Sequence, residues 1–281
     1  MSYSRARRLV LKLAGPWCEW ELLVRMEGTI RLGIDEHSFR GKDLAIAITC
    51  LSSRRMVAIL PSDWQAELRA ALGKLPEEGV RQRIEAVCID MKRSLRAVVR
   101  EELPSAKVVA DPFHVIADAN RRLDETRRLE RGKARTTLPR WPLLKAPEKL
   151  SCRHQTQLDW LVGCFSMLAE HYWVKERLRA LHRCATRAQA EDILASTLLV
   201  MEASDDAAVL PWARTLRDWR REIVAYFSYP VTNGFTEGCH TKIKLLKRLT
   251  YGSRNIQLYL RKVLLGFLPH SPETLAPQLW T

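Results

Sequence analysis

The sequence of 281 residues contains no apolar run of the ~18 residues that a helix needs to cross a bilayer. Its N-terminal stretch, "MSYSRARRLVLKLAGPWCEWELL", is interrupted by charge too often for a secretory signal. Internal repeats and low-complexity tracts are also missing. These absences argue against a membrane or secreted protein, and we expect a globular, cytoplasmic one.

Cysteine pairs of the C-x-x-C type, a common zinc-binding spacing, are missing too. The seven cysteines are scattered, which is typical of reduced and mostly buried thiols rather than disulfides. We interpret "CRH" at Cys152–His154 and "CH" at Cys239–His240 as incidental rather than as metal ligands.

Acidic residues are the scarcer charge: 32 aspartates and glutamates face 46 lysines and arginines, a formal net charge of +14. Residues 121–149 contain ten basic and four acidic residues, and residues 231–262 contain seven basic and one acidic. Two such blocks favour a surface that binds nucleic acid over two solvated faces.

Short apolar runs rich in β-branched residues begin at residue 28. "TIRLGIDEHSF", "DLAIAITCLSS" and "RRMVAIL" predict three antiparallel strands, and "PSDWQAELRAALGKL" predicts a helix. "RIEAVCIDM" and "AKVVADPF" predict two further strands, separated by the helix "KRSLRAVVREEL". This order predicts an α/β fold with a mixed sheet: three antiparallel strands, then two parallel ones.

Strand patterns disappear between about residues 130 and 229, where helical periodicity predicts a large α-helical insertion. Five tryptophans lie there. Their helical spacing favours packing in a core over stacking on a displaced base. They are Trp141, Trp160, Trp173, Trp212 and Trp219.

A helix is predicted over residues 237–249, after the turn signal "TNG". Glu237 shares a stripe of this helix with Lys244 and Arg248. The opposite face is apolar and consists of Ile243, Leu245, Leu246 and Leu249. Lys242 falls on that apolar side, so its stem is expected to snorkel.

Three carboxylates occupy positions that this fold brings together. Asp35 lies in the first predicted strand, Asp90 ends the fourth, and Glu237 begins the late helix. If the fourth strand pairs with the first, the two aspartates become neighbours. Clustered carboxylates repel one another and are stable when divalent cations neutralise them. Two such ions can activate a water or a 3′-hydroxyl to attack a phosphodiester. Taken singly, each aspartate is more often a turn or cap residue.

Three blocks resemble, in order and wording, the catalytic core of bacterial insertion-sequence transposases of the ISL-three family. They are "LGIDEHSFRGK", "VCIDMKRSLRAVVREELPSAKVVADPFHV" and "TNGFTEGCHTKIKLLKRLTYGSRN", and the resemblance covers roughly residues 28–265. It implies a DDE transposase with a ribonuclease H-like fold, holding Mg²⁺ or Mn²⁺ at Asp35, Asp90 and Glu237.

The resemblance also implies partners and further site residues. Double-stranded DNA, namely transposon ends and target, is the expected partner of a homo-oligomer associated with the nucleoid. Asp111 and His114 of "DPFHV" are candidates for lining the site, with the end of the fifth strand as an equal alternative for Asp111. The expected phosphate-binding residues are Lys242, Lys244, Lys247, Arg248 and Arg254.

Family members usually carry an N-terminal zinc-binding and helix-turn-helix region, and little precedes the first catalytic strand in this sequence. We therefore expect an N-terminally truncated catalytic core. The predicted division is a basic helix and linker (1–27), the first part of the core (28–130), the helical insertion (131–229) and the final catalytic helix with its basic tail (230–268). The alternatives are an inactive DNA-binding remnant, a structure-specific nuclease of the same fold, and a basic protein that binds only proteins.

Overall fold

A computed structural model describes residues 20–40, 43–62, 64–76, 79–249 and 255–267. Within it the chain forms two compact units, one of residues up to 109 and from 231 on, the other of residues 110–230. Most of the predicted N-terminal basic helix lies outside the described residues, which begin just before the short helix α2 (Glu21–Val24).

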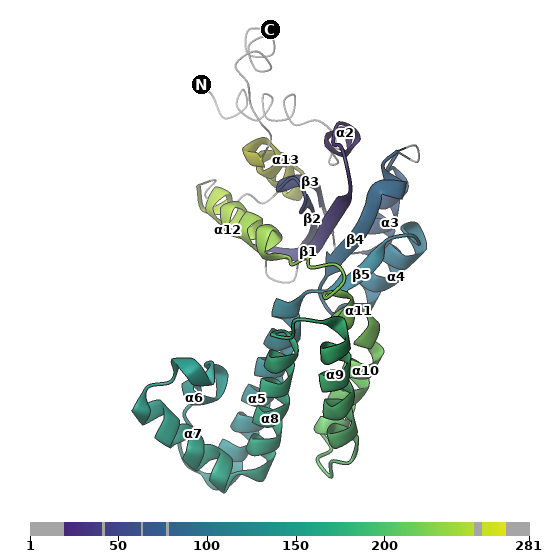
Figure 1. Cartoon of the computed structure of the whole chain (residues 1–281). Helices are drawn as coiled ribbons and strands as arrows, with labels where there is room; N and C mark the ends of the chain where they lie inside the picture. The colour runs from purple at the N-terminus through teal and green to yellow at the C-terminus, as the bar shows by residue number, and fades with distance from the viewer. Residues whose placement is uncertain (1–19, 41–42, 63, 77–78, 250–254, 268–281) are drawn as a thin grey trace. The chain divides into compact units, whose positions relative to one another are not determined.

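The first unit is built on a five-stranded sheet in the order β3-β2-β1-β4-β5 (Figure 1). The strands are β1 (Ile30–Arg40), β2 (Asp43–Cys50), β3 (Arg55–Leu60), β4 (Ile84–Ile89) and β5 (Lys107–Ala110). β1 pairs antiparallel with β2 and parallel with β4, and β2 pairs antiparallel with β3. The predicted mixed sheet, with β1–β3 antiparallel and β4 parallel to β1, is confirmed.

Helices accompany this sheet (Figure 1): α12 contacts β1 and β2, α13 contacts β3, α4 contacts β4, and α3 contacts β3 and α4. They are α3 (Gln65–Gly73), α4 (Arg93–Glu102), α12 (Gly234–Leu249) and α13 (Ile256–Phe267), with a 3-10 turn at Arg81–Arg83. Side chains alternate along β2, so the small Ala45 and Ala47 share one face and pack with Ile243 and Tyr259. This face is where α12 and α13 complete the core.

The second unit is described throughout and is helical after Ala110, the last residue of β5. Its helices are α5 (Pro112–Ala134), α6 (Trp141–Leu144), α7 (Cys152–Cys164), α8 (Ser166–Leu181), α9 (Arg187–Glu202), α10 (Val209–Asp218) and α11 (Arg220–Ala225), with a 3-10 turn at Pro147–Lys149. Sequence signals set several boundaries. Pro112 opens α5, Ser151 caps α7, and Thr186 forms a capping box with Gln189 at α9.

The predicted core packing of the five tryptophans is wrong for three of them. Trp212 and Trp219 are buried, but Trp141, Trp160 and Trp173 are 62%, 43% and 37% exposed. Helical spacing shows which residues share a face, but it does not show whether another helix covers that face. The leucines at Leu123, Leu143, Leu158, Leu161 and Leu168 form the core instead.

Two smaller expectations also need correction. Leu245 and Leu249 of α12 were expected on a packed apolar face, but they are 54% and 65% exposed. Among the cysteines that the structure describes, Cys152 and Cys164 are exposed rather than buried. No helix in the described parts of the chain is both long and apolar enough to span a membrane.

Candidate active site

Asp35 and Asp90 lie side by side where β1 and β4 run in parallel. In that ladder Gly33 is opposite Cys88 and Ile34 is opposite Ile89, so the next residue on each strand is an aspartate. One carboxylate oxygen of Asp35 and one of Asp90 lie within 4.8 Å of each other. The structure thus brings together two of the three predicted carboxylates.

The Asp35 carboxylate is 5% exposed and held by contacts on both oxygens. Oδ1 accepts a hydrogen bond of 2.7 Å from the backbone N–H of Glu36. Oδ2 lies 3.4 Å from Nδ1 of His240 on α12. These contacts fix the orientation of the carboxylate and give His240 a contact with a predicted site residue.

The first turn of α12 is anchored directly to β1. Asn233, just before the helix, donates from Nδ2 to the carbonyl oxygen of Ile34 at 3.2 Å. The Thr236 hydroxyl lies 2.7 Å from that of Thr49 on β2. Gly33 makes this approach possible, because a Cβ there would lie 2.6 Å from oxygens of both Asn233 and Thr236.

Glu237 belongs to this anchored turn. It follows Thr236 and lies one turn before His240, so its neighbours on both sides contact the two central strands. Its own side chain is half-buried. Glu237 therefore lies in the first turns of α12, the part of the helix that contacts β1.

A buried group of rings lies behind Asp35. The ring of His37 lies 5.1 Å from that of His240, and its Nε2 is 2.9 Å from the Tyr259 hydroxyl on α13. Burial, with the nearby His240 and the α12 lysines, lowers the pKa of His37 to about 4, so this ring is neutral near pH 7. Burial raises the pKa of Tyr259 to about 12, which keeps its hydroxyl protonated.

The basic residues of α12 differ in their surroundings. Lys244 and Arg248 are exposed. The Lys247 ammonium donates to the carbonyl oxygen of Phe39, and the Lys242 ammonium lies 4.4 Å from the Phe267 ring centroid. Arg254 lies outside the described residues.

Two more charged pairs complete the description. Glu36, next to Asp35, forms an ion pair with Lys92, so this carboxylate is already neutralised. In the second unit, Asp111 immediately precedes α5 and its Oδ2 lies 3.0 Å from Nδ1 of His114.

Sequence reasoning missed the residues that place Asp35 and Glu237: Gly33, Asn233, Thr236 and His240. The signal was partly available, since Gly33, Asp35 and His37 alternate along one face of β1. This alternating pattern does not predict which helix packs on that face of β1.

Comparison with known proteins gives a consistent family. A family model described as transposase matches residues 32–263. The transposase for insertion sequence element IS1001 of Bordetella parapertussis is 28% identical over 84% of this chain and 60% of its own length. The transposase for insertion sequence element IS1557 of Mycobacterium tuberculosis is 27% identical over 92% of this chain and 65% of its own length.

The chain thus spans about three fifths of these relatives. Among solved structures, a chain of the Drosophila P element transposase strand transfer complex aligns with 98% of this chain and 86% of its own, at 12% identity and a TM-score of 0.49.

Proposed function

Since the chain belongs to the ISL-three family of insertion-sequence transposases, we propose that it cleaves DNA strands and transfers them to new positions, with Asp35, Asp90 and Glu237 as its metal-binding carboxylates. One observation carries the proposal. Asp35 within β1 and Asp90 just after β4 lie on neighbouring parallel strands with carboxylate oxygens within 4.8 Å of each other, and α12 is anchored to β1.

The residues fit a hard divalent cation. Carboxylate oxygens are the ligands that Mg²⁺ and Mn²⁺ prefer. Two ionised carboxylates with oxygens this close repel each other, and a divalent cation bound between them would offset that repulsion. When bound, such ions supply activation of water or a 3′-hydroxyl and stabilise the leaving oxygen of a phosphodiester.

The protein's own groups hold this arrangement. His240 and the backbone N–H of Glu36 orient the Asp35 carboxylate. Asn233 and Thr236 fix the turn that carries Glu237. Lys244 and Arg248 continue the helix as exposed cations, which suits them to contact DNA phosphates. Lys242 and Lys247 belong to the same proposed surface, along with Arg254 in the sequence.

Double-stranded DNA is the proposed partner, as transposon end and as target. The names of the relatives, each a transposase for an insertion element, support this. The proposal includes assembly of more than one copy of the chain on DNA. It also includes Asp111 and His114 as residues that line the active site.

The test is cleavage and strand transfer on labelled DNA with Mg²⁺ or Mn²⁺, comparing the parent with Asp90→Asn and Glu237→Gln. Glu67→Gln is a matched control, because Glu67 also lies in the first turn of a helix in this unit but is exposed. We expect activity in the parent and in the control, and at least a hundredfold loss in the other two variants with DNA binding retained.

The outcomes separate the alternatives. DNA binding without metal-dependent cleavage in the parent would indicate an inactive DNA-binding protein. Cleavage without joining of a 3′-hydroxyl end would indicate a nuclease. Full activity of Asp90→Asn would refute the carboxylate assignment.

A further inference from the structure

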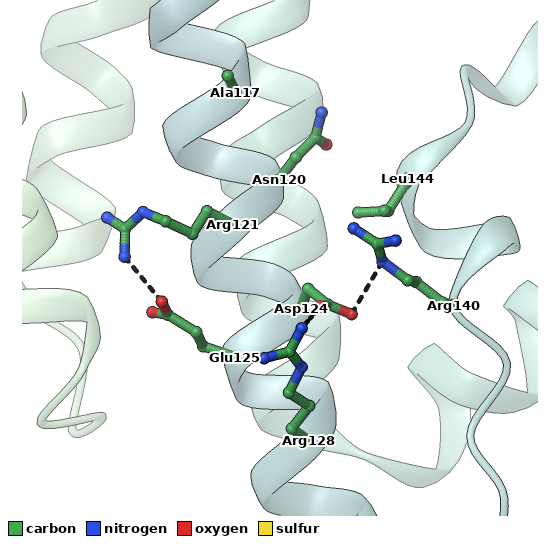
Figure 2. Close-up of a pocket in the computed structure, with 8 residues that line it drawn as sticks. All are labelled: Ala117, Asn120, Arg121, Asp124, Glu125, Arg128, Arg140 and Leu144. Carbon is green, nitrogen blue, oxygen red and sulfur yellow. Dashed lines mark hydrogen bonds and ion pairs between the residues drawn. The ribbon is translucent and has the colours of Figure 1, made fainter. Parts of the chain in front are cut away.

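A pocket of about 350 Å³ lies in the helical unit, between α5 and the short segment around α6 (Figure 2). One stripe of α5 forms one wall, with residues spaced three or four apart, and the α6 segment contributes two side chains. Its polar lining is Asn120, Arg121, Asp124, Glu125, Arg128 and Arg140. It lies in the more N-terminal of the two basic blocks of the sequence.

One end of the pocket carries excess positive charge. Asp124 is 6% exposed and forms ion pairs with Arg127 at 2.8 Å, Arg128 at 2.9 Å and Arg140 at 3.2 Å. Burial opposes ionisation of this carboxyl, but the hydrogen bond and charge of Arg127, with the other two arginines, outweigh it and lower the pKa of Asp124. One carboxylate therefore faces three guanidiniums.

Two of these guanidiniums face solvent. The side chains of Arg128 and Arg140 are 65% and 52% exposed, and each guanidinium has five N–H donors, few of which the ion pair uses. Asp124 thus holds two exposed guanidiniums at one place on the surface, an arrangement suited to a phosphate. The other end of the pocket is balanced, since Arg121 is paired with Asp118 and Glu125.

Two further groups point to the rest of a ligand. Oδ1 of Asn120 is buried and has no hydrogen-bond partner within the described chain, so it is an acceptor without a donor. Trp141, adjacent to Arg140, is 62% exposed, and the Arg140 guanidinium lies 5.9 Å from its ring centroid. An ion-pair network that only stabilised the fold would explain Asp124 and Arg127 but neither of these groups.

We propose that this pocket binds one unpaired nucleotide of a DNA strand, with its phosphate at Arg128 and Arg140. Oδ1 of Asn120 accepts a hydrogen bond from an N–H of the base, and the exposed Trp141 ring provides a stacking surface. The volume is at the lower end of the range of ligand pockets, which suits one nucleotide. Base–aromatic stacking requires an unpaired base, which distinguishes this ligand from intact duplex. The proposal rests on the proposed function only in assuming that the chain handles DNA.

The test is binding of a fluorescent single-stranded oligonucleotide, followed by anisotropy across a range of salt concentrations. The full chain carries Asp90→Asn and the buffer contains a chelator, so no strand is cut and failure of the proposed chemistry does not affect the result. For Arg128→Gln with Arg140→Gln, we expect about tenfold weaker binding. Loss of one phosphate contact also lowers the slope of log K against log salt by about 0.7. Arg187→Gln is the matched control, since Arg187 is 54% exposed and paired with Glu191 on α9.

A second variant separates binding from folding. Asn120→Leu removes an unsatisfied buried acceptor, so we expect an unchanged or higher melting temperature together with weaker binding of the single strand. Trp141→Ala is expected to weaken binding of the single strand about tenfold and binding of duplex much less.

The proposal is overturned if these variants bind the single strand as tightly as the Arg187→Gln control. It is also overturned if Trp141→Ala weakens binding of the single strand and of duplex equally, which would mean that the pocket does not select an unpaired base.

Discussion

Replacing Gly33 by alanine tests how the carboxylate-bearing helix is held. The new methyl group would lie 2.6 Å from Asn233 Oδ1 and Thr236 Oγ1 and 2.9 Å from Thr49 Oγ1, all three on buried residues. The first turn of α12 must therefore move away from β1, and the hydrogen bond from Asn233 to Ile34 weakens.

The magnitude follows from two contributions. Overpacking a buried site costs about 1–3 kcal/mol, and each weakened hydrogen bond adds about 1 kcal/mol. We expect the free energy of unfolding to fall by about 2–4 kcal/mol, which lowers the melting temperature by about 4–10 °C. Since Glu237 lies on the displaced turn, the rate of DNA cleavage should fall by about a hundredfold, the effect of a misplacement of about 1 Å.

The assays are thermal melting by circular dichroism and metal-dependent cleavage of labelled DNA, each with Gly238→Ala as control. Gly238 lies in the same helix, and a Cβ there would meet nothing within 4 Å. Its replacement should raise stability by about 0.5–1 kcal/mol through helix propensity. If Gly33→Ala melts and cleaves like Gly238→Ala, the close approach of α12 to β1 is refuted.

Three other substitutions probe charge and orientation. Burial lowers the pKa of His182 from 6.5 to about 4, so between these pH values the unfolded chain binds more protons than the folded one. The free energy of unfolding therefore falls as the pH drops from about 6.5 towards 4. His182→Leu should make this pH dependence less steep in denaturant titrations, and an unchanged slope would contradict the assignment. Asp124→Asn leaves three arginines without their shared carboxylate. It should lower the free energy of unfolding by about 1–3 kcal/mol in the same titrations. No loss would mean that these ion pairs do not contribute to stability. His240→Ala should weaken Mn²⁺ binding about tenfold in calorimetry, because the Asp35 carboxylate loses its orienting contact. His240→Asn should restore part of the Mn²⁺ affinity. Equal affinities of the parent and both variants would exclude an orienting role for His240.

Much of the sheet could be predicted because its information is local. Alternating apolar residues indicate each strand, and the order of strands and helices predicts a mixed sheet in which Asp35 and Asp90 become neighbours. The same local logic fails where a partner surface decides the outcome. Leu245 and Leu249 lie about 160° and about 120° around α12 from the buried Ile243, so the packing that buries Ile243 leaves them exposed.

The anchoring of α12 is the clearest case of non-local information. Asn233 is 199 residues from its partner Ile34, and Thr236 is 187 residues from Thr49. Short polar residues next to "NG" predict a turn, and nothing local distinguishes a turn from an anchor. The exposed tryptophans are similar, since burial depends on which helices pack together.

The separation of the sheet from its covering helices has a consequence during synthesis on the ribosome. Roughly 120 residues separate the end of β5 from the start of α12, which corresponds to about 6–25 s of translation. During that time Phe39, Met56 and Ile59, which pack against α12 and α13 in the finished protein, have no covering helix. The nascent chain therefore presents an apolar sheet face while its helical unit is being made, and this interval is when chaperone binding and aggregation compete with folding.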